Sequence, residues 1–388
     1  MNKVTIPFKI ARLLLAVIFI MLLGGCASVE IKSQPVDMSE SLKIGFIGPL
    51  TGSQAPFGQS QLEAVKMLVE ETDKGGGIDG RLVDLIPEDS KGAPADAVTA
   101  AHKLIDVDHV IAIIGDMQSG DTMAIAPIVE QAKIPLVTPI ATSPAISNAG
   151  DFVFRTMPST QTQVELLANI FASQGIKRVG VIYVDNEFGK RSYEAFKGLF
   201  GGEIVLAEAH KQDESDFRSS LSKVQSKIQS SDIQSSDVQI LVLMSYPKES
   251  GLLMRQLREL NLTIPVYGIE TLGHIVTQKT AGLALEGAYY AYPRTDTNSA
   301  FKDQFVKRFS HDPEFGTDTA YDAASLILES IHECGIEPVE IKNCLYKVGK
   351  DYQGVSGNIT FDQNGDVHRP AVLYQFRNVT AVKIEGLG

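Results

Sequence analysis

Short apolar runs alternate with segments of helical spacing along most of this chain, and this alternation restricts the fold more than any other feature. Four runs are LKIGFIGPL (42–50), RLVDLIPED (81–89), VIAIIGD (110–116) and IPLVTPI (134–140), and residues 94–106 and 120–132 between them have helical spacing. Near-continuous apolar strands that alternate with amphipathic helices indicate a parallel sheet covered on both faces. The sequence therefore predicts an α/β fold.

A second series of the same kind follows the first. It begins after FVFRTMPS (152–159) and contains RVGVIYVD (178–185), EIVLAEA (203–209), VQILVLMSY (238–246) and IPVYGIE (264–270). Without residues 1–25, about 363 residues remain, which suits two domains better than one. We therefore expect two Rossmann-like lobes in tandem.

The first long helix has recognisable boundary signals. Ser60 and Glu63 have the spacing of a capping box, and apolar residues with helical spacing follow them. Three glycines, Gly75 to Gly77, then interrupt the pattern. These signals predict a helix that begins near Ser60 and ends before Gly75.

The N-terminal segment has the pattern of an export signal. Lys3, Lys9 and Arg12 precede an apolar run of eleven residues, 13–23, which is too short to span a bilayer as a helix. The string LGGC that ends at Cys26 resembles a bacterial lipobox. We expect a signal peptide at residues 1–25, lipidation of Cys26 and a polar tether at 26–41. The alternatives are an uncleaved anchor or a buried free thiol.

The charge of the chain excludes some partners. The formal net charge is −12, and residues 1–25 carry three positive charges and no acid, so removing them leaves about −15. This charge argues against nucleic acid and against an anionic lipid surface as partners.

The other two cysteines form one candidate pair. Cys334 and Cys344 lie in the stretch ECGIEPVEIKNCLY, and an export signal favours a disulfide between them. Two free thiols on adjacent helices are the alternative.

Catalytic and metal-binding motifs are absent from the sequence. It contains no HExxH, CxxC, GxSxG or P-loop pattern, and its histidines do not have the spacing of metal ligands. GFIGPLTG follows the first strand but does not match GxGxxG. We therefore expect no enzyme activity, no metal and no cofactor, with a nicotinamide-dependent enzyme as the weaker alternative.

Polar segments instead follow the carboxyl ends of the apolar strands, where open parallel sheets bind ligands. They are GDMQSGDT (115–122), TPIATSPA (138–145), DNEFG (185–189), SYPKE (245–249) and GIETLG (268–273). The first two belong to the first series of strands and the other three to the second, so these segments are the candidates for a ligand site.

Eight segments in register resemble the type I periplasmic binding proteins, in particular the leucine/isoleucine/valine-binding group of ABC-transporter receptors. They are IGPLTGSQAPFG, GGGIDGRLV, IIGDMQSG, IPLVTPIATSP, FVFRTMPS, VIYVDNEFGK, YGIET and GVSGNITFDQNGD. The similarity runs from residue 42 to about residue 385. It implies two α/β lobes joined by three crossovers, with a ligand bound in the cleft between them.

The resemblance also implies roles for individual residues. Ser119 and Thr142 match hydroxyls that bind a ligand's α-carboxylate, and Ala141 matches a backbone carbonyl that binds its α-ammonium group. Glu270 matches the acid of the other lobe that pairs with the ammonium. By residue type alone, Ser119 could be a helix N-cap, Thr142 a turn residue and Glu270 a solvent-facing side chain.

Three aromatic residues match positions that line the cleft in this family, namely Phe57, Phe188 and Tyr246. Gln118 is a further candidate for the cleft. Phe57 and Phe188 stand where relatives often carry tyrosine, which makes the expected wall more apolar. From periodicity alone, each aromatic residue could equally belong to a hydrophobic core.

We therefore predict a periplasmic or cell-surface lipoprotein that captures a small ligand, foremost an amino acid, for an inner-membrane ABC permease. Lobe 1 is expected to comprise residues 42–156 and 292–353, and lobe 2 residues 157–291 and 354–388. Small carboxylates or amides are alternative ligands. The alternative function is a regulatory or docking lipoprotein on the same fold, such as an activator of a cell-wall synthase, and Ala27 after the lipidated cysteine mildly favours it.

Overall fold

The computed structural model describes residues 41–228, 237–293 and 298–385. The described residues all belong to one compact unit, Glu40–Gly388. The expected signal peptide, Cys26 and nearly all of the tether lie outside the described residues. Among those residues, no helix is both long and apolar enough to cross a membrane.

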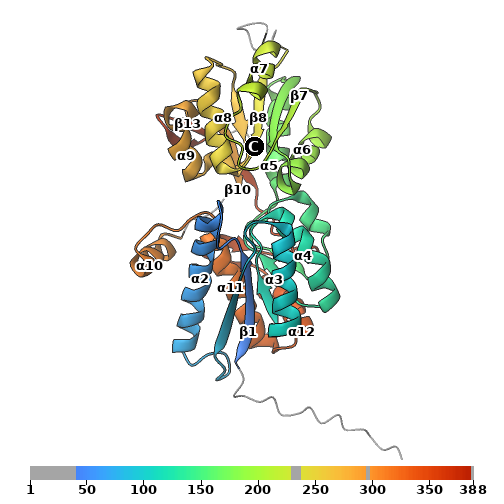
Figure 1. The fold of residues 1–388 in the computed structure, drawn as a ribbon, viewed down its shortest axis with the longest axis vertical. Helices are drawn as coiled ribbons and strands as arrows, with labels where there is room; N and C mark the ends of the chain where they lie inside the picture. The colour runs from blue at the N-terminus through green and yellow to red at the C-terminus, as the bar shows by residue number, and fades with distance from the viewer. Residues whose placement is uncertain (1–40, 229–236, 294–297, 386–388) are drawn as a thin grey trace, which may run out of the picture. The chain divides into compact units, whose positions relative to one another are not determined.

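The first lobe contains a five-stranded parallel sheet in the order β2-β1-β3-β4-β5 (Figure 1). Its strands are β1 (Leu42–Gly48), β2 (Val83–Asp89), β3 (Ala112–Ile114), β4 (Leu136–Thr138) and β5 (Val153–Arg155). Strands β3, β4 and β5 are buried along their whole length, which explains why they are apolar except at their last residues, Thr138 in β4 and Arg155 in β5.

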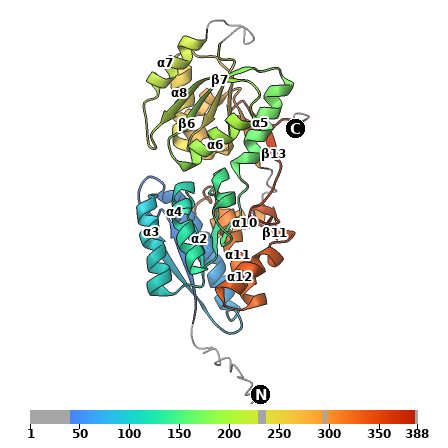
Figure 2. The same cartoon turned by 90° about the vertical axis from the view of Figure 1, so that its right-hand side faces the viewer.

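Helices cover both faces of this sheet (Figure 2). One face packs against α2 (Ala55–Lys74), α11 (Thr317–Cys334) and α12 (Pro338–Val348). The other packs against α3 (Pro94–His102), with its π-helical continuation η1 (Lys103–Asp108), and α4 (Ser119–Ala132). A short 3-10 helix, η2 (Pro144–Asn148), follows β4, and α10 (Ser299–Phe309) packs on α2.

The second lobe contains a seven-stranded mixed sheet in the order β14-β13-β10-β9-β8-β6-β7. Its strands are β6 (Arg178–Val184), β7 (Glu203–His210), β8 (Ile240–Met244), β9 (Val266–Gly268), β10 (Tyr289–Pro293), β13 (Ala371–Arg377) and β14 (Thr380–Lys383). The predicted strands of the second series are parallel, but β13 runs antiparallel to β10 and β14. The alternation of strands and helices did not predict this antiparallel edge.

Helices also cover both faces of the second sheet. Helices α5 (Thr160–Ser173) and α6 (Glu187–Leu199) pack on one face. Helices α7 (Arg218–Lys227), α8 (Pro247–Glu259) and α9 (Ile275–Ala281) pack on the other, with the 3-10 turns η3 (Glu270–Gly273) and η4 (Gly282–Leu285). The two covered sheets confirm the predicted α/β class with two lobes.

The segment before β13 packs with the first lobe. A small hairpin, β11 (Tyr352–Gly354) and β12 (Gly357–Ile359), precedes Phe361 and Val367, which lie in the core cluster of the first sheet. Buried Arg155 donates a 2.7 Å hydrogen bond to Asp366 and so holds this segment against β5. This packing differs from the expected boundary at Gly354. The other lobe boundaries stay a prediction.

Helix α2 begins earlier than the sequence suggested. It starts at Ala55, so Ser60 lies inside the helix and the expected capping box is wrong. The buried Ser60 hydroxyl instead lies 2.8 Å from the Thr317 hydroxyl at the start of α11, and it accepts a 3.1 Å bond from the Glu314 amide. Ser60 therefore connects two helices. The helix ends at Lys74, before the three glycines, as predicted.

Cys334 and Cys344 form a disulfide with a Cα–Cα distance of 6.2 Å. It joins the last residue of α11 to the middle of α12, across a sequence separation of 10 residues. Both helices pack on the first sheet, so the bridge stabilises one face of the first lobe.

We predict that replacing both cysteines by serine destabilises the chain by about 2–3 kcal/mol, because the unfolded chain regains the entropy that a short closed loop removes. Denaturant unfolding of the oxidised wild type, the reduced wild type and the double variant measures this difference. The reduced wild type should match the variant. Equal midpoints for the oxidised and reduced wild type would contradict the prediction.

Candidate functional site

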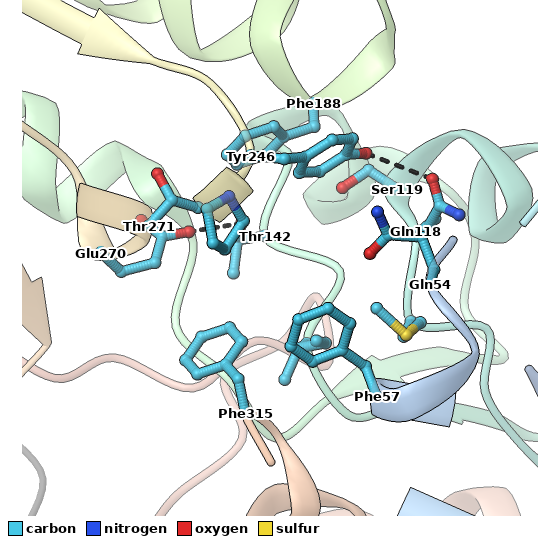
Figure 3. Close-up of a pocket in the computed structure, with 13 residues that line it drawn as sticks. Gln54, Phe57, Gln118, Ser119, Thr142, Phe188, Tyr246, Glu270, Thr271 and Phe315 are labelled. Atoms are coloured by element: carbon cyan, nitrogen blue, oxygen red, sulfur yellow. Dashed lines mark hydrogen bonds between the residues drawn. The ribbon is translucent and has the colours of Figure 1, made fainter. Parts of the chain in front are cut away.

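The loops after the strands meet in a pocket between the two lobes, which we call the central pocket (Figure 3). Counted together with its opening to solvent, it has an empty volume of about 490 Å³. Its lining residues are Gln54, Phe57, Met117, Gln118, Ser119, Ile140, Thr142, Phe188, Tyr246, Pro247, Glu270, Thr271 and Phe315. Seven of the eight residues expected at a ligand site line it.

Ala141 is the expected residue that does not line the central pocket. It is fully buried, and its side chain packs in the core cluster between the first sheet and helices α3 and α4. The role expected for Ala141 belongs to its backbone carbonyl, and that role stays a prediction.

Glu270 is the only charged residue that lines the central pocket among the described residues. It begins η3, directly after β9, and only 2% of it is exposed. Its backbone amide donates a 2.8 Å bond to the Gln163 side chain on α5, which fixes the loop. Its carboxylate lies beside the Thr142 side chain, which comes from the other lobe (Figure 3).

The carboxylate of Glu270 is only half satisfied. Oε1 accepts a 3.1 Å bond from the Thr142 hydroxyl, whereas the buried Oε2 has no hydrogen-bond partner. Burial raises the pKa of Glu270 from its ordinary 4.5 to about 7, although nearby donor groups of its own backbone, the Gln163 side chain and the Thr142 hydroxyl oppose the rise. A cation placed beside Oε2 would remove this penalty.

Ser119 is the first residue of α4, and Gln118, not Ser119, occupies the N-cap position. The Ser119 Oγ accepts a 3.2 Å bond from the Ser143 amide, so its own hydrogen remains available to donate. The Gln118 side chain caps none of the first helical amides. The Ser119 hydroxyl and the free amides at the N-terminus of α4 can therefore bind a small anionic group together.

Gln118 and Tyr246 join the two lobes across the central pocket. The Tyr246 hydroxyl donates to Gln118 Oε1 at 3.3 Å and accepts a 3.1 Å bond from Asn186 (Figure 3). The ring of Tyr246 stacks on Phe188, with centroids 5.3 Å apart and planes 5° apart. Burial raises the pKa of Tyr246 far above its ordinary value, so the hydroxyl remains protonated.

An apolar wall completes the central pocket opposite Tyr246. Phe57 and Phe315 lie on it as neighbouring rings (Figure 3), and Met117 and Ile140 pack with them. Phe57 was expected from the resemblance. Phe315 was missed because it lies in the loop before α11, where no periodic pattern marks it.

Gln54 is another lining residue that the sequence did not identify. It precedes α2, and its side chain extends into the central pocket (Figure 3). The expected helix start at Ser60 placed Gln54 in an ordinary loop. The correct start of α2 would have shown it as the N-cap residue.

Two further carboxyl groups lie buried near the start of α4. Burial raises the pKa of Asp116 to about 7, and the Gln118 amide opposes that rise. Burial and then the charge of Asp116 raise the pKa of Asp121 to about 8. Among the described residues, no group of three or more histidine, cysteine or acidic side chains is placed to hold a metal ion.

Known proteins match this chain over most of its length. A family model described as periplasmic binding protein matches residues 41–381. The leucine-, isoleucine-, valine-, threonine- and alanine-binding protein of Pseudomonas aeruginosa is 26% identical over 339 residues, which are 85% of this chain and 88% of that protein.

Solved structures agree with the sequence matches. The leucine-binding protein LivK from Thermotoga maritima is 25% identical, with a TM-score of 0.76 and coverage of 88% of this chain and 97% of that chain. LivJ from Streptococcus pneumoniae, solved with isoleucine, is 24% identical with a TM-score of 0.76, and the match covers 89% and 100% of the two chains.

We predict that Glu270→Gln stabilises the ligand-free protein above pH 7 by on the order of 3 kcal/mol. Between pH 4.5, the ordinary pKa, and about pH 7, the pKa in the folded state, Glu270 is ionised in the unfolded wild type and must take up a proton on folding. Above pH 7 the folded wild type carries the buried charge. Wild-type stability therefore falls as pH rises through this window, and the advantage of the variant disappears below pH 4.5.

Thermal or denaturant unfolding of both proteins from pH 4 to 8 measures this difference. Glu259→Gln is a matched control, because Glu259 is exposed on α8, and it should change stability by less than about 0.5 kcal/mol at every pH. A difference between wild type and Glu270→Gln that is constant with pH would contradict the prediction.

Proposed function

The chain belongs to the periplasmic binding protein family, and we propose that it is a lipid-anchored receptor that delivers an α-amino acid to an ABC permease. Family membership makes it a solute-binding protein, not an enzyme, of the branched-chain amino acid ABC transporter type. It also implies a periplasmic or other extracytoplasmic location. The ligand, the anchor and the permease are parts of the proposal.

The unpaired oxygen of Glu270 is the observation that carries the proposal. A buried carboxylate without a partner is costly, and a ligand ammonium group would supply the missing charge and hydrogen bond. No lysine or arginine lines the central pocket among the described residues, so the ligand itself must bring the cation.

The other end of the ligand fits the start of α4. The free hydrogen of the Ser119 hydroxyl and the first amides of the helix favour an α-carboxylate there. The Thr142 hydroxyl donates to Glu270 in the ligand-free protein. Once an ammonium group binds Glu270, this hydroxyl could instead turn to the carboxylate.

The rest of the central pocket suits an apolar side chain. Phe57, Phe188 and Phe315 provide aromatic surface, and Met117 and Ile140 add aliphatic surface. We therefore propose an aliphatic or aromatic amino acid, in keeping with the branched-chain ligands named for the relatives. The side-chain amide of Gln54 can form a hydrogen bond with one polar group on the side chain of the ligand.

Residues of both lobes line the central pocket, and this gives a way for the permease to distinguish the ligand-bound protein. Glu270 and Tyr246 belong to the second lobe, whereas Ser119, Thr142 and Gln118 belong to the first. A ligand held by both lobes favours the conformation in which they approach each other. We propose that the permease recognises this closed conformation.

The first test is a thermal-shift screen of the protein against the twenty amino acids, small carboxylates and small amides. We expect an amino acid to raise the melting temperature, because a ligand at 100 times its Kd stabilises by about 2.7 kcal/mol. Glu270→Gln should reduce the affinity for that amino acid much more than Gln118→Ala does, because a charge-assisted contact is lost.

Either of two results would contradict the amino-acid proposal. One is equal affinity losses for Glu270→Gln and Gln118→Ala. The other is a shift only with carboxylates or amides that lack an ammonium group. No shift with any compound would instead favour the docking lipoprotein.

The lipid anchor is tested at Cys26. Wild type expressed in a bacterium should incorporate an alkyne-tagged fatty acid and enter the detergent phase of a phase separation, because two or three acyl chains anchor a protein stably. Cys26→Ser should lose both properties, while Ala27→Ser should keep them. Labelling of Cys26→Ser at the wild-type level would exclude the anchor.

A further inference from the structure

A second cavity adjoins the central pocket, and we call it the tyrosine cavity. It lies between β10, β13 and the helices α10 and α11, and its empty volume, counted together with its opening to solvent, is about 1580 Å³. It shares Glu270 and Phe315 with the central pocket. The residues that matter below are Tyr290, Tyr292, Tyr374, His274, Glu314 and Asp318.

Rings separate the two cavities. His274 lies between Phe57 and Phe315, with centroid distances of 5.5 Å and 5.3 Å and edge-to-face geometry. The Val276 amide donates a 3.1 Å bond to His274 Nδ1, which holds the ring in place at the start of α9. Burial lowers the pKa of His274 to about 4, so the imidazole adds no positive charge to the tyrosine cavity.

Three tyrosines form one wall of the tyrosine cavity. Tyr290 stacks on Tyr374 with centroids 5.2 Å apart, and Tyr292 meets both rings edge-on at 6.4 Å and 6.5 Å. The faces of aromatic rings carry partial negative charge and attract cations. Tyr290 itself is covered by Tyr374 and by Phe376, whose centroid lies 5.3 Å away, so the attraction of this wall for a positively charged group comes from Tyr292 and Tyr374.

Carboxyl groups with unsatisfied oxygens line the same cavity. Glu270 is 2% exposed, and its Oε2 has no hydrogen-bond partner; Oε2 of Glu314 is also buried without one. Burial raises the pKa of Asp318, while the Thr319 amide and the charge of Arg369 oppose the rise. The cavity therefore contains carboxyl oxygens that its own hydrogen bonds do not satisfy, and a bound cation would favour the ionised form of these groups.

Lys302 is the only lysine or arginine that lines the tyrosine cavity among the described residues, and it does not neutralise this charge. Its ammonium group forms a 3.0 Å ion pair with Asp312, which is not a lining residue. Arg369 acts on Asp318 but is not a lining residue, and it donates to the carbonyls of Asn358 and Ser356.

We propose that the tyrosine cavity is a second binding site, for the ammonium or quaternary ammonium group of a small organic cation. The tyrosine wall and the carboxylates of Glu314 and Asp318 bind it, and Glu270 adds negative charge from the side of the central pocket. This site goes beyond the proposed amino-acid site, because most of its residues do not line the central pocket.

Calorimetric titration of the protein with choline tests the proposal. The matched probe is 3,3-dimethyl-1-butanol, which has the same shape but no charge. We expect choline to bind at least about tenfold more tightly than the alcohol, because only the cation interacts with ring faces and carboxylates. Equal affinity for the two probes, or no binding of choline, would overturn the proposal.

Variants locate the bound probe. Glu314→Gln and Tyr374→Leu should each lower the affinity for choline by about fivefold or more. Asp303→Asn removes a negative charge from α10 at an exposed residue outside the cavity lining, and it should leave the affinity unchanged.

Phe188→Ala separates this proposal from the amino-acid site, because Phe188 lines only the central pocket. Retention of choline binding in Phe188→Ala supports the tyrosine cavity, even if the amino-acid screen finds no ligand. Loss of choline binding in Phe188→Ala, with no loss in Glu314→Gln, would place the cation in the central pocket and overturn the proposal.

Discussion

Glu270 carries its carboxylate into the interior with one oxygen bonded to Thr142 and the other without a partner. The hydroxyl of Thr142, which donates to it, belongs to the other lobe, so the position of this carboxylate depends on both lobes. The protein tolerates the cost of this burial only because the rest of the fold fixes the loop, as the Gln163 side chain does through the Glu270 amide. The cation recognition that we propose for this protein follows from that cost.

Parallel strands explain why the polar groups of the site converge. Strands β3 and β4 in the first lobe and β6, β8 and β9 in the second all end at the central pocket, and each is followed by a helix or turn. Buried apolar strands hold the backbone rigidly, while the loops after them are free to carry hydroxyls, amides and a carboxylate. The core therefore determines the geometry of the site without contacting the ligand.

The sequence predicted the parts of the site that follow from strand ends and from family resemblance. Ser119 and Thr142 follow apolar strands of the first sheet, and Tyr246 and Glu270 follow apolar strands of the second, so their places at the carboxyl ends of the strands could be derived. Gln54 and Phe315 could not be predicted in this way, because tertiary contacts determine their positions. Ser60 is the clearest example: its local pattern is that of a cap, but its hydroxyl bonds across to α11. The antiparallel edge formed by β13 was missed because strand direction depends on partners distant in the sequence.

The order of strands in the second sheet has a consequence for biogenesis. Strand β13 pairs with β10 although more than seventy residues separate them, and the intervening helices α10, α11 and α12 complete the first lobe. Neither lobe is therefore continuous in the chain. The first lobe needs the segment up to Val367 and the second needs β13, so neither can reach its native packing until nearly all of the chain has emerged from the ribosome or the translocation channel. This arrangement delays folding until the end of synthesis, so an exported chain stays unfolded while it passes through the translocation channel.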